Sequence, residues 1–253
     1  MDVLRDREGR LVIAHDHQDA RTRRPLELTE ALDAFLEPPL DQVEIDCDLK
    51  LPGREAELAG TLAGHGILDR VMVSTMEIES LIKLRTLEPE LRLGWTYPKT
   101  RRDWTRDRWA APAVAAGLLV LRRRFPRTLR RGAPQLGVDA VWAYHRLITP
   151  RLMAAAQDAG VELIAWTVDD PARIAQLAEM GVSGICSNDP RLFDAAAATP
   201  APPRAVGALA PEEAEAAVEE LAEDAQPSGN AKPPRSGAKA GRTRPARQQA
   251  RES

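Results

Sequence analysis

Cysteine and long apolar runs are scarce in this chain, and each absence excludes a class of protein. Cys47 and Cys186 are the only cysteines among 253 residues, so a secreted scaffold held by several disulfides is excluded and a reducing compartment is expected. The N-terminus, MDVLRDREGR, is charged from its start and lacks the apolar core of a signal peptide. The longest apolar run, near residues 110–121, is far shorter than the ~20 residues that cross a bilayer. We therefore expect a soluble, cytoplasmic protein with no transmembrane segment.

Composition changes sharply near Phe193 and divides the chain into two parts. Residues 1–195 contain periodic apolar segments, whereas residues 196–253 are built from Ala, Pro, Gly and charged residues without any aromatic side chain. Such a tail cannot bury enough surface to offset its ordering entropy, so we expect it to be disordered. Its acidic stretch, 211–225, predicts at most a transient helix. Its basic end, 232–251, is interpreted as a solvating tail, and no nucleic-acid partner is expected.

Strands and helices are expected to alternate through the folded part. The strand segments are LVIAHD, QVEIDCDL, RVMVST, LRLGWTY, VDAVWAY, VELIAWTV and VSGICS. The helices are expected at residues 28–36 (with Thr29 as a cap), 54–65, 77–87, 110–124, 150–159 and 171–180. The fourth helix is expected to end before Pro126, because proline interrupts helical hydrogen bonding.

Repeated strand-then-helix units predict an α/β fold with parallel strands covered by helices. A closed (β/α)8 barrel and an open doubly wound sheet both fit, but no G-x-G-x-x-G follows any strand. In a barrel, catalytic groups lie at the C-terminal ends of the strands. The chemically rich residues fall there: Asp48, Lys50, Ser74, Trp95, His145, Trp166, Thr167, Asn188 and Asp189. This placement favours the TIM (β/α)8-type barrel.

The stretch QVEIDCDLKLPG, residues 42–53, places charge on one face of an expected strand. Glu44, Asp46, Asp48 and Lys50 alternate with Val43, Ile45, Cys47 and Leu49. Charges on an exposed edge strand would discourage aggregation. In a barrel the charged face instead points inward, where buried acids need a partner such as a cation.

Four segments resemble the glycerophosphodiester phosphodiesterase family. DREGRLVIAHD is similar to the family's D-G-x-x-V-V-x-H-D hairpin, and VEIDCDLK to its strand ending acid-x-Lys. IAWTVDDPARIAQLAEMGVSGICSNDP resembles its W-T-V-[ND] strand, helix and G-V-[DS]-G-I-x-[ST]-[DN]-x-P segment. RVMVSTMEIESLIKLRTLEPELRLG is similar to the strand–helix–strand between them. The resemblance covers residues 2–193 and implies a (β/α)8 barrel that hydrolyses small-molecule glycerophosphodiesters to glycerol 3-phosphate and an alcohol, a reaction of lipid metabolism, with a divalent cation such as Ca²⁺ or Mg²⁺.

The resemblance implies a role for five residues. His15 matches a general acid/base histidine, and imidazole suits this role because it exchanges protons near neutral pH. Asp2 and Asp48 match metal-binding carboxylates, which are oxygen ligands of the kind that hard divalent ions prefer. Lys50 would balance the phosphate charge, and Trp166 would line the pocket near the glycerol.

The residues themselves leave alternatives open at several of these positions. His17 could be the functional histidine in place of His15, and Asp46 could replace Asp48 as a ligand. His145 lies at the expected active face, whereas His65 ends an amphipathic helix and is expected to be structural. Trp166 could equally be core packing. The Arg-rich stretches TRRDWTRDRW and LRRRFPRTLRR are interpreted as solvated faces, with a phospholipid-surface contact as the second interpretation.

The chain departs from the family pattern at its start. The family begins with a strand ending His-Arg-Gly, a helix and an E-x-D pair, of which only Asp2 has a counterpart here. A barrel without its first strand and helix would have two unpaired edges, one metal ligand fewer and one acid/base partner fewer. Either the true start lies further upstream, which we favour because the match from Asp2 onward has no gap, or the chain is a shortened relative with little activity. The alternative functions are therefore a non-catalytic barrel remnant that binds through its tail and a related phospholipase-type phosphodiesterase.

Overall fold

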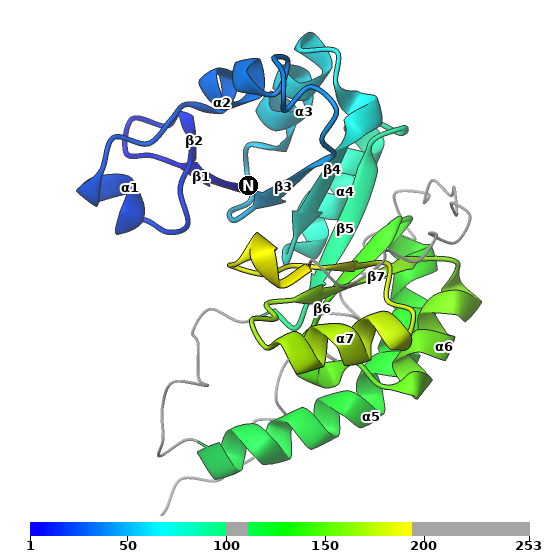
Figure 1. Ribbon diagram of the computed structural model, residues 1–253. Coiled ribbons are helices and arrows are strands. Elements are labelled where there is room, and N and C mark those ends of the chain that lie inside the picture. Colours follow the sequence, from blue (N-terminus) through cyan, green and yellow to red (C-terminus); the bar gives the residue numbers. More distant parts are fainter. Residues whose placement is uncertain (100–110, 194–253) are drawn as a thin grey trace, which may run out of the picture.

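The computed structural model describes residues 1–99 and 111–193, with side chains described from residue 115 in the second range (Figure 1). The domain boundary predicted at residue 195 and the tail at 196–253 lie outside the described residues. The first arginine-rich stretch, residues 100–109, and residue 110, where the fourth helix was predicted to begin, also lie outside them.

One eight-stranded sheet forms the centre of the molecule, in the order β2-β1-β3-β4-β5-β6-β7-β8. β2 is antiparallel to β1, and all other neighbours pair in parallel. The strands are β1 (Asp2–Arg5), β2 (Leu11–Ile13), β3 (Ile45–Leu49), β4 (Val71–Thr75), β5 (Arg92–Tyr97), β6 (Ala140–Tyr144), β7 (Glu162–Trp166) and β8 (Gly184–Ile185). From β3 onward each strand lies beside the next strand in the sequence, as in a (β/α)-barrel.

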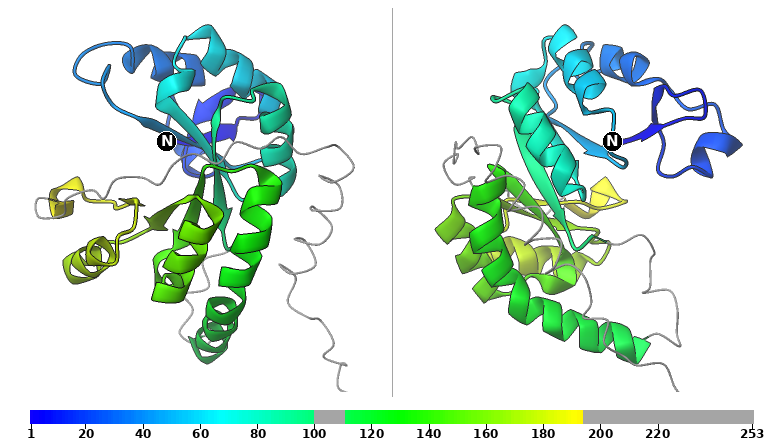
Figure 2. Two further views of the ribbon diagram at one scale, coloured as in Figure 1. Left: turned by 90° about the vertical axis from the view of Figure 1, so that its right-hand side faces the viewer. Right: turned by 180° about the vertical axis from the view of Figure 1, so that it is seen from behind.

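Helices follow the strands and lie on the outer side of the curved sheet (Figures 1 and 2). They are α1 (Asp19–Thr22), α2 (Leu28–Ala34), α3 (Glu55–Gly64), α4 (Ile78–Leu87), α5 (Ala111–Leu136), α6 (Pro150–Ala159) and α7 (Pro171–Glu179), with the short 3-10 turns η1 (Leu68–Arg70), η3 (His145–Leu147) and η4 (Pro190–Phe193). Strand residues such as Val71 and Val73 of β4 are fully buried in the apolar core that joins sheet and helices. None of the helices in these ranges is both long and apolar enough to cross a membrane.

The alternation predicted for residues 45–49 is present in β3. Ile45, Cys47 and Leu49 are buried in the helix-side core, whereas Asp46 and Asp48 are half-buried on the opposite, inner face. Val43 differs from the prediction because it precedes the strand and is exposed. The inner face of the sheet therefore carries the acidic residues.

One predicted helix end and one predicted capping residue are wrong. α5 does not end before Pro126 but continues through Pro126 and Pro134 to Leu136. Phe125, Leu129 and Leu136 are fully buried on one side of it, and this tertiary packing outweighs the hydrogen bonds that the prolines remove. α2 is not capped by Thr29: Glu27 is its N-cap and forms a capping box with Glu30.

The sheet is open at one place. Among the described strands, β8 pairs only with β7, and no pairing joins it to β1 or β2. The two ends nevertheless lie close enough for the charges of Asp46 and Asp2 to act on the Cys186 thiol just after β8. Burial is the main cause that raises the pKa of Cys186, and these two carboxylates raise it further. The fold is thus the predicted α/β barrel type with one unclosed side.

Candidate active site

Two carboxylates and one ammonium group meet at the C-terminal edge of β3. Asp2 and Asp48 are register partners in the parallel pair β1–β3. Lys50 Nζ lies 2.5 Å from Asp48 Oδ2 and 3.1 Å from Asp2 Oδ1. All three side chains are partly buried, so the ammonium is held between two acids with limited access to water.

His15 joins this group from the other side of Asp2. Its Nδ1 lies 2.8 Å from Asp2 Oδ2, while 78% of the side chain is exposed. The hairpin register, in which Val3 pairs with Ile13, places the loop after β2 above the start of β1. His15, Asp2, Lys50 and Asp48 therefore form one continuous chain of polar contacts at the sheet edge.

A second pair of side chains holds the loop that carries His15. The backbone N–H of His15 donates to Asp19 Oδ2 at 3.0 Å, and Arg23 donates to both carboxylate oxygens of Asp19 at 2.7 and 2.8 Å. The hydrogen bond from Arg23 is the main cause that lowers the pKa of Asp19 to about 2. Asp19 therefore remains ionised at any ordinary pH and continues to accept the hydrogen bond from the His15 backbone.

Burial and charge act in opposite directions on the central groups. Burial raises the pKa of the Asp48 carboxyl more than the Lys50 ammonium lowers it. Burial alone would lower the pKa of Lys50, but the Asp48 and Asp2 carboxylates outweigh it and raise the pKa. Lys50 is therefore positively charged near neutral pH.

Asp46 lies one inner-face position before Asp48 and is only half satisfied. Its Oδ2 accepts a hydrogen bond from Ser74 Oγ at 3.0 Å, whereas its Oδ1 is buried with no partner in the part of the chain that the structure describes. Burial raises the pKa of Asp46 to about 7, and the nearby Asp48 and Asp2 carboxylates raise it as well. This orphaned acceptor marks a place where a polar atom or a cation would be stabilised.

The donor set suits a hard divalent cation. Asp2 and Asp48 oxygens already converge on one positive charge, and Mg²⁺ is commonly held by one or two carboxylates together with waters and substrate phosphate oxygens. Within residues 1–99 and 111–193, no three His, Cys, Asp or Glu side chains are grouped closely enough to hold an ion by themselves. The residues fit a cation whose remaining ligands come from substrate and water.

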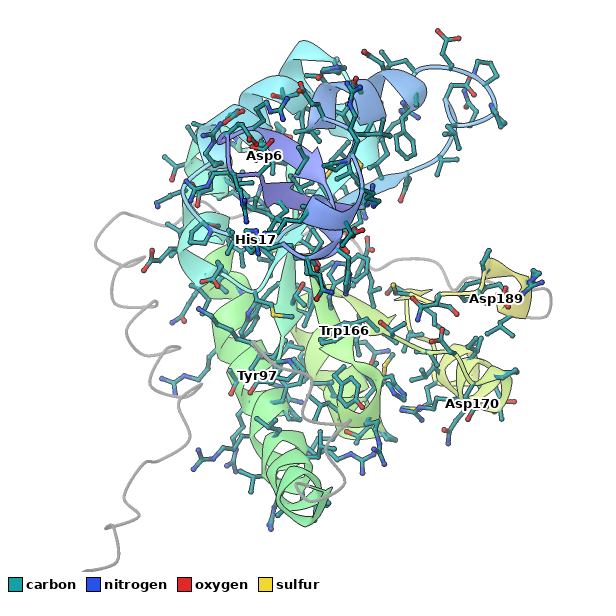
Figure 3. The ribbon with its side chains drawn as sticks, turned by 90° about the vertical axis from the view of Figure 1, so that its left-hand side faces the viewer. Asp6, His17, Tyr97, Trp166, Asp170 and Asp189 are labelled. Carbon is teal, nitrogen blue, oxygen red and sulfur yellow. The ribbon has the colours of Figure 1, made fainter. Side chains whose placement is uncertain are left out.

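Trp166 is the last residue of β7 (Figure 3). Because β3 to β7 pair in parallel, it lies on the same edge of the sheet as Lys50, which follows β3. Its contacts go to β6: Nε1 donates to the Trp142 carbonyl at 2.9 Å, and its ring centroid lies 5.7 Å from that of Tyr144. The structure thus joins His15, Asp2, Lys50 and Asp48 through direct contacts, whereas Trp166 forms an aromatic pair with Tyr144 at the ends of β6 and β7 and is not part of that chain of contacts.

The other histidines lie in three different environments. His17 is exposed two residues beyond the histidine that contacts Asp2. His65 Nδ1 donates to the Thr61 carbonyl oxygen at 2.7 Å, its Nε2 lies 3.4 Å from Asp33 Oδ1, and it is the C-cap residue of α3, in line with a structural role. His145 is half-buried against Tyr144, and its Nδ1 is buried with no partner among the described residues. Burial and the positive charge of Arg173 lower the pKa of His145, so it is neutral at pH 7.

Sequence reasoning missed three supporting residues. Asp19 and Arg23 hold the His15 loop, and the i, i+4 spacing of an acid and a base was the available signal. Glu55 is buried, accepts from the backbone N–H of Gly53 and from Ser80 Oγ (2.6 Å), and so fixes the loop that follows Lys50. Nothing in the sequence around Glu55 distinguishes it from a solvent-exposed first-turn acid.

A sequence model described as the glycerophosphoryl diester phosphodiesterase family matches residues 51–192, more than half of the chain. The chain belongs to this family. It is 25% identical to a glycerophosphodiester phosphodiesterase of Caldanaerobacter subterraneus subsp. tengcongensis, over 75% of this chain and 81% of that protein. Membership makes the protein a phosphoric diester hydrolase of the glycerophosphodiester phosphodiesterase type.

Solved structures of the same family share the fold. A glycerophosphodiester phosphodiesterase from Parabacteroides distasonis superposes with a TM-score of 0.55 at 14% identity, covering 89% of this chain and 83% of that one. One from Agrobacterium tumefaciens also gives 0.55, at 16% identity and covering 76% and 84%. An Oleispira antarctica phosphodiesterase in complex with the product sn-glycerol-3-phosphate gives 0.50, at 15% identity and covering 77% and 82%.

Proposed function

We propose that this protein hydrolyses glycerophosphodiesters to glycerol 3-phosphate and an alcohol, using a divalent cation held at the edge of β1 and β3. The observation that carries the proposal is the continuous contact chain His15–Asp2–Lys50–Asp48. It combines a proton-exchanging group, paired carboxylates and a fixed positive charge, which are the parts that phosphodiester cleavage needs. The product complex of the Oleispira antarctica phosphodiesterase supports glycerol 3-phosphate as the product.

His15 acts as the general acid/base. Its Nδ1 contacts Asp2, which orients the ring and leaves Nε2 for exchanging a proton with the substrate. Because the His15 backbone is held by Asp19, the ring keeps its position above Asp2 while the proton moves.

Asp2 and Asp48 would hold Ca²⁺ or Mg²⁺, and Asp46 Oδ1 on the same face of β3 is a further acceptor without a partner among the described residues. When bound, the ion would supply Lewis-acid polarisation of the phosphoryl oxygens. Lys50 balances the negative charge of the phosphate, and the Trp166–Tyr144 pair gives the glycerol an apolar surface. The inner face of the sheet and its helix-side core keep these groups in fixed relative positions.

The role of His15 is tested by comparing two histidine variants. His15→Asn removes the proton-exchanging group from Asp2, and we expect kcat for glycerophosphocholine to fall by about 10²–10⁴-fold. His17→Asn is the matched control, because His17 is exposed in the same loop, and it should retain the activity of the wild type. Equal losses in both variants, or none in the His15 variant, would overturn the assignment.

The cation site is tested by binding as well as by activity. Titration calorimetry with Ca²⁺ and Mg²⁺ should show a site that Asp48→Asn weakens at least tenfold and Asp69→Asn, an exposed carboxylate on η1, leaves unchanged. Hydrolysis should stop in EDTA and return when the ion is restored. A protein that binds neither ion and releases no glycerol 3-phosphate from any glycerophosphodiester would instead be a non-catalytic barrel. Cleavage of inositol or sphingomyelin lipids alone would indicate a related phospholipase-type enzyme.

A further inference from the structure

α5 is much longer than the strand that precedes it. Its 26 residues extend about 39 Å, whereas the 6 residues of β5 extend about 20 Å. α6, which packs beside it, has 10 residues and extends about 15 Å. Part of α5 must therefore project beyond the sheet.

The C-terminal half of α5 is fixed to the body of the protein, so the projection lies at its N-terminal end. The carbonyl oxygen of Gly137, directly after the helix, accepts a hydrogen bond from the Arg85 guanidinium, and Arg85 also pairs with the buried Asp139 before β6. Phe125 stacks on Tyr97 with ring centroids 3.9 Å apart, and Tyr97 is the last residue of β5. The N-terminal part of α5 consequently extends past the C-terminal end of β5, as Figures 1 and 2 show, and within residues 115–124 only Leu118 and Leu121 are packed against the core.

This overhanging segment, residues 115–124, and the helix surface behind it have an unusual chemistry. Leu119 and Val120 are 61% and 51% exposed. The helix contains no acidic residue, and its six arginines are all exposed: Arg122, Arg123, Arg124, Arg127, Arg130 and Arg131. An exposed apolar tip followed by a row of guanidinium groups is typical of helices that lie on a membrane surface.

We propose that the overhanging segment of α5 docks on an anionic phospholipid bilayer, with Leu119 and Val120 entering the headgroup region and the arginines contacting lipid phosphates. Charge complementarity selects an anionic partner, since each basic residue near such a surface strengthens binding by about fivefold. Nucleic acid is the less suitable anion, because it would leave the two apolar side chains in water. The segment projects from the same sheet edge that carries Asp48, Lys50 and Trp166, so docking would turn the candidate active site towards the membrane that supplies phospholipid-derived substrates; this consequence rests on the proposed function.

Vesicle co-sedimentation with the full chain tests the proposal. The wild type should bind vesicles containing phosphatidylglycerol, bind pure phosphatidylcholine at least tenfold more weakly, and lose binding as salt is raised. Leu119→Ser with Val120→Ser, and separately Arg123→Glu with Arg127→Glu, should each weaken binding to the anionic vesicles at least tenfold. Arg7→Glu with Arg21→Glu, the same charge change at exposed positions of the N-terminal hairpin and α1, should bind like the wild type.

The alternative occupants give different results. No binding to anionic vesicles, or binding that both α5 variants retain, overturns the proposal. If the wild type forms a dimer and Leu119→Ser with Val120→Ser converts it to a monomer, a second copy of the chain covers the segment. Vesicle binding only after Glu219→Gln with Glu220→Gln would mean that the acidic stretch 211–225 covers it, and tighter binding to RNA than to vesicles would identify a nucleic acid. Hydrolysis of soluble glycerophosphocholine should be unchanged in every α5 variant, which separates this proposal from the proposed function.

Discussion

At the scale of single residues, the candidate site depends on contacts between segments that are far apart in the sequence. Asp2 contacts His15 through a hairpin register and Lys50 through a parallel strand pair. The sequence could not distinguish His15 from His17, because the choice depends on which of them faces Asp2 after the chain turns back. Resemblance to the family selected His15, and the contact with Asp2 gives that selection a geometric basis.

The Asp19–Arg23 pair gives a residue-scale prediction with a defined pH dependence. Arg23→Gln removes the main cause of the low pKa of Asp19, so that pKa should rise from about 2 towards its ordinary value of 3.8. A carboxyl whose folded-state pKa is lowered stabilises the protein above about pH 4, and this contribution is lost as the pH falls through about 2 in the wild type. In the variant, the hold on the His15 loop should be lost at higher pH. Carboxyl carbon NMR titration measures the shift, with Arg21→Gln as the control that should leave Asp19 unchanged.

At the scale of elements, regular patterns were predicted well and proline was misjudged. The alternation in β3 and the proline start and glycine end of α6 follow from local chemistry, and all are present. α5 was predicted to end too early because only the helical hydrogen bond that Pro126 removes was considered. The stacking of Phe125 on Tyr97 and the burial of Leu129 are tertiary contacts that no local rule contains.

Gly94 in β5 gives a prediction for strand packing. A methyl group at this position would lie 2.7 Å from Trp142 Nε1 and 3.2 Å from Met72 Sδ. Gly94→Ala should therefore push the indole aside and destabilise the protein by about 1–3 kcal/mol, measured by urea unfolding with tryptophan fluorescence as the probe. Gly60→Ala is the matched control on α3, where nothing lies within 4 Å, and it should stabilise slightly. A neutral Gly94 variant would show that Trp142 is loosely packed.

At the scale of the whole molecule, the order of strands followed from the alternation of strands and helices. The buried ion pair of Arg85 and Asp139, which we call the clamp, did not follow from the sequence. Asp139 accepts from the Leu93 backbone N–H at 2.9 Å and pairs with Arg85, and this buried pair joins β5, α4 and the start of β6. Charged residues at these positions looked like ordinary surface groups in the sequence. Their burial is a result of the way the helices cover the sheet.

The clamp predicts a large difference between two aspartates. Asp139→Ala leaves the Arg85 guanidinium buried without its counter-charge and should lower the free energy of unfolding by about 3–5 kcal/mol. Asp158→Ala breaks the exposed pair with Arg130 and should cost less than about 1 kcal/mol. Urea denaturation of both variants measures the difference, and similar losses would contradict the burial of the clamp.

The long α5 is fully buried in the core only from Phe125 onward, whereas Leu118 and Leu121 before it are only partly buried, and this gives its two halves different stabilities. Backbone amides of residues 125–136 can open only when the core around Leu129 opens, so their exchange with deuterated solvent should approach the rate of global unfolding. Amides of residues 118–124 are protected by the helix itself and by the partial packing of Leu118 and Leu121, and they should exchange much faster. One continuous helix would then contain two cooperative units, and its free end could unwind and reform while the catalytic edge remains folded.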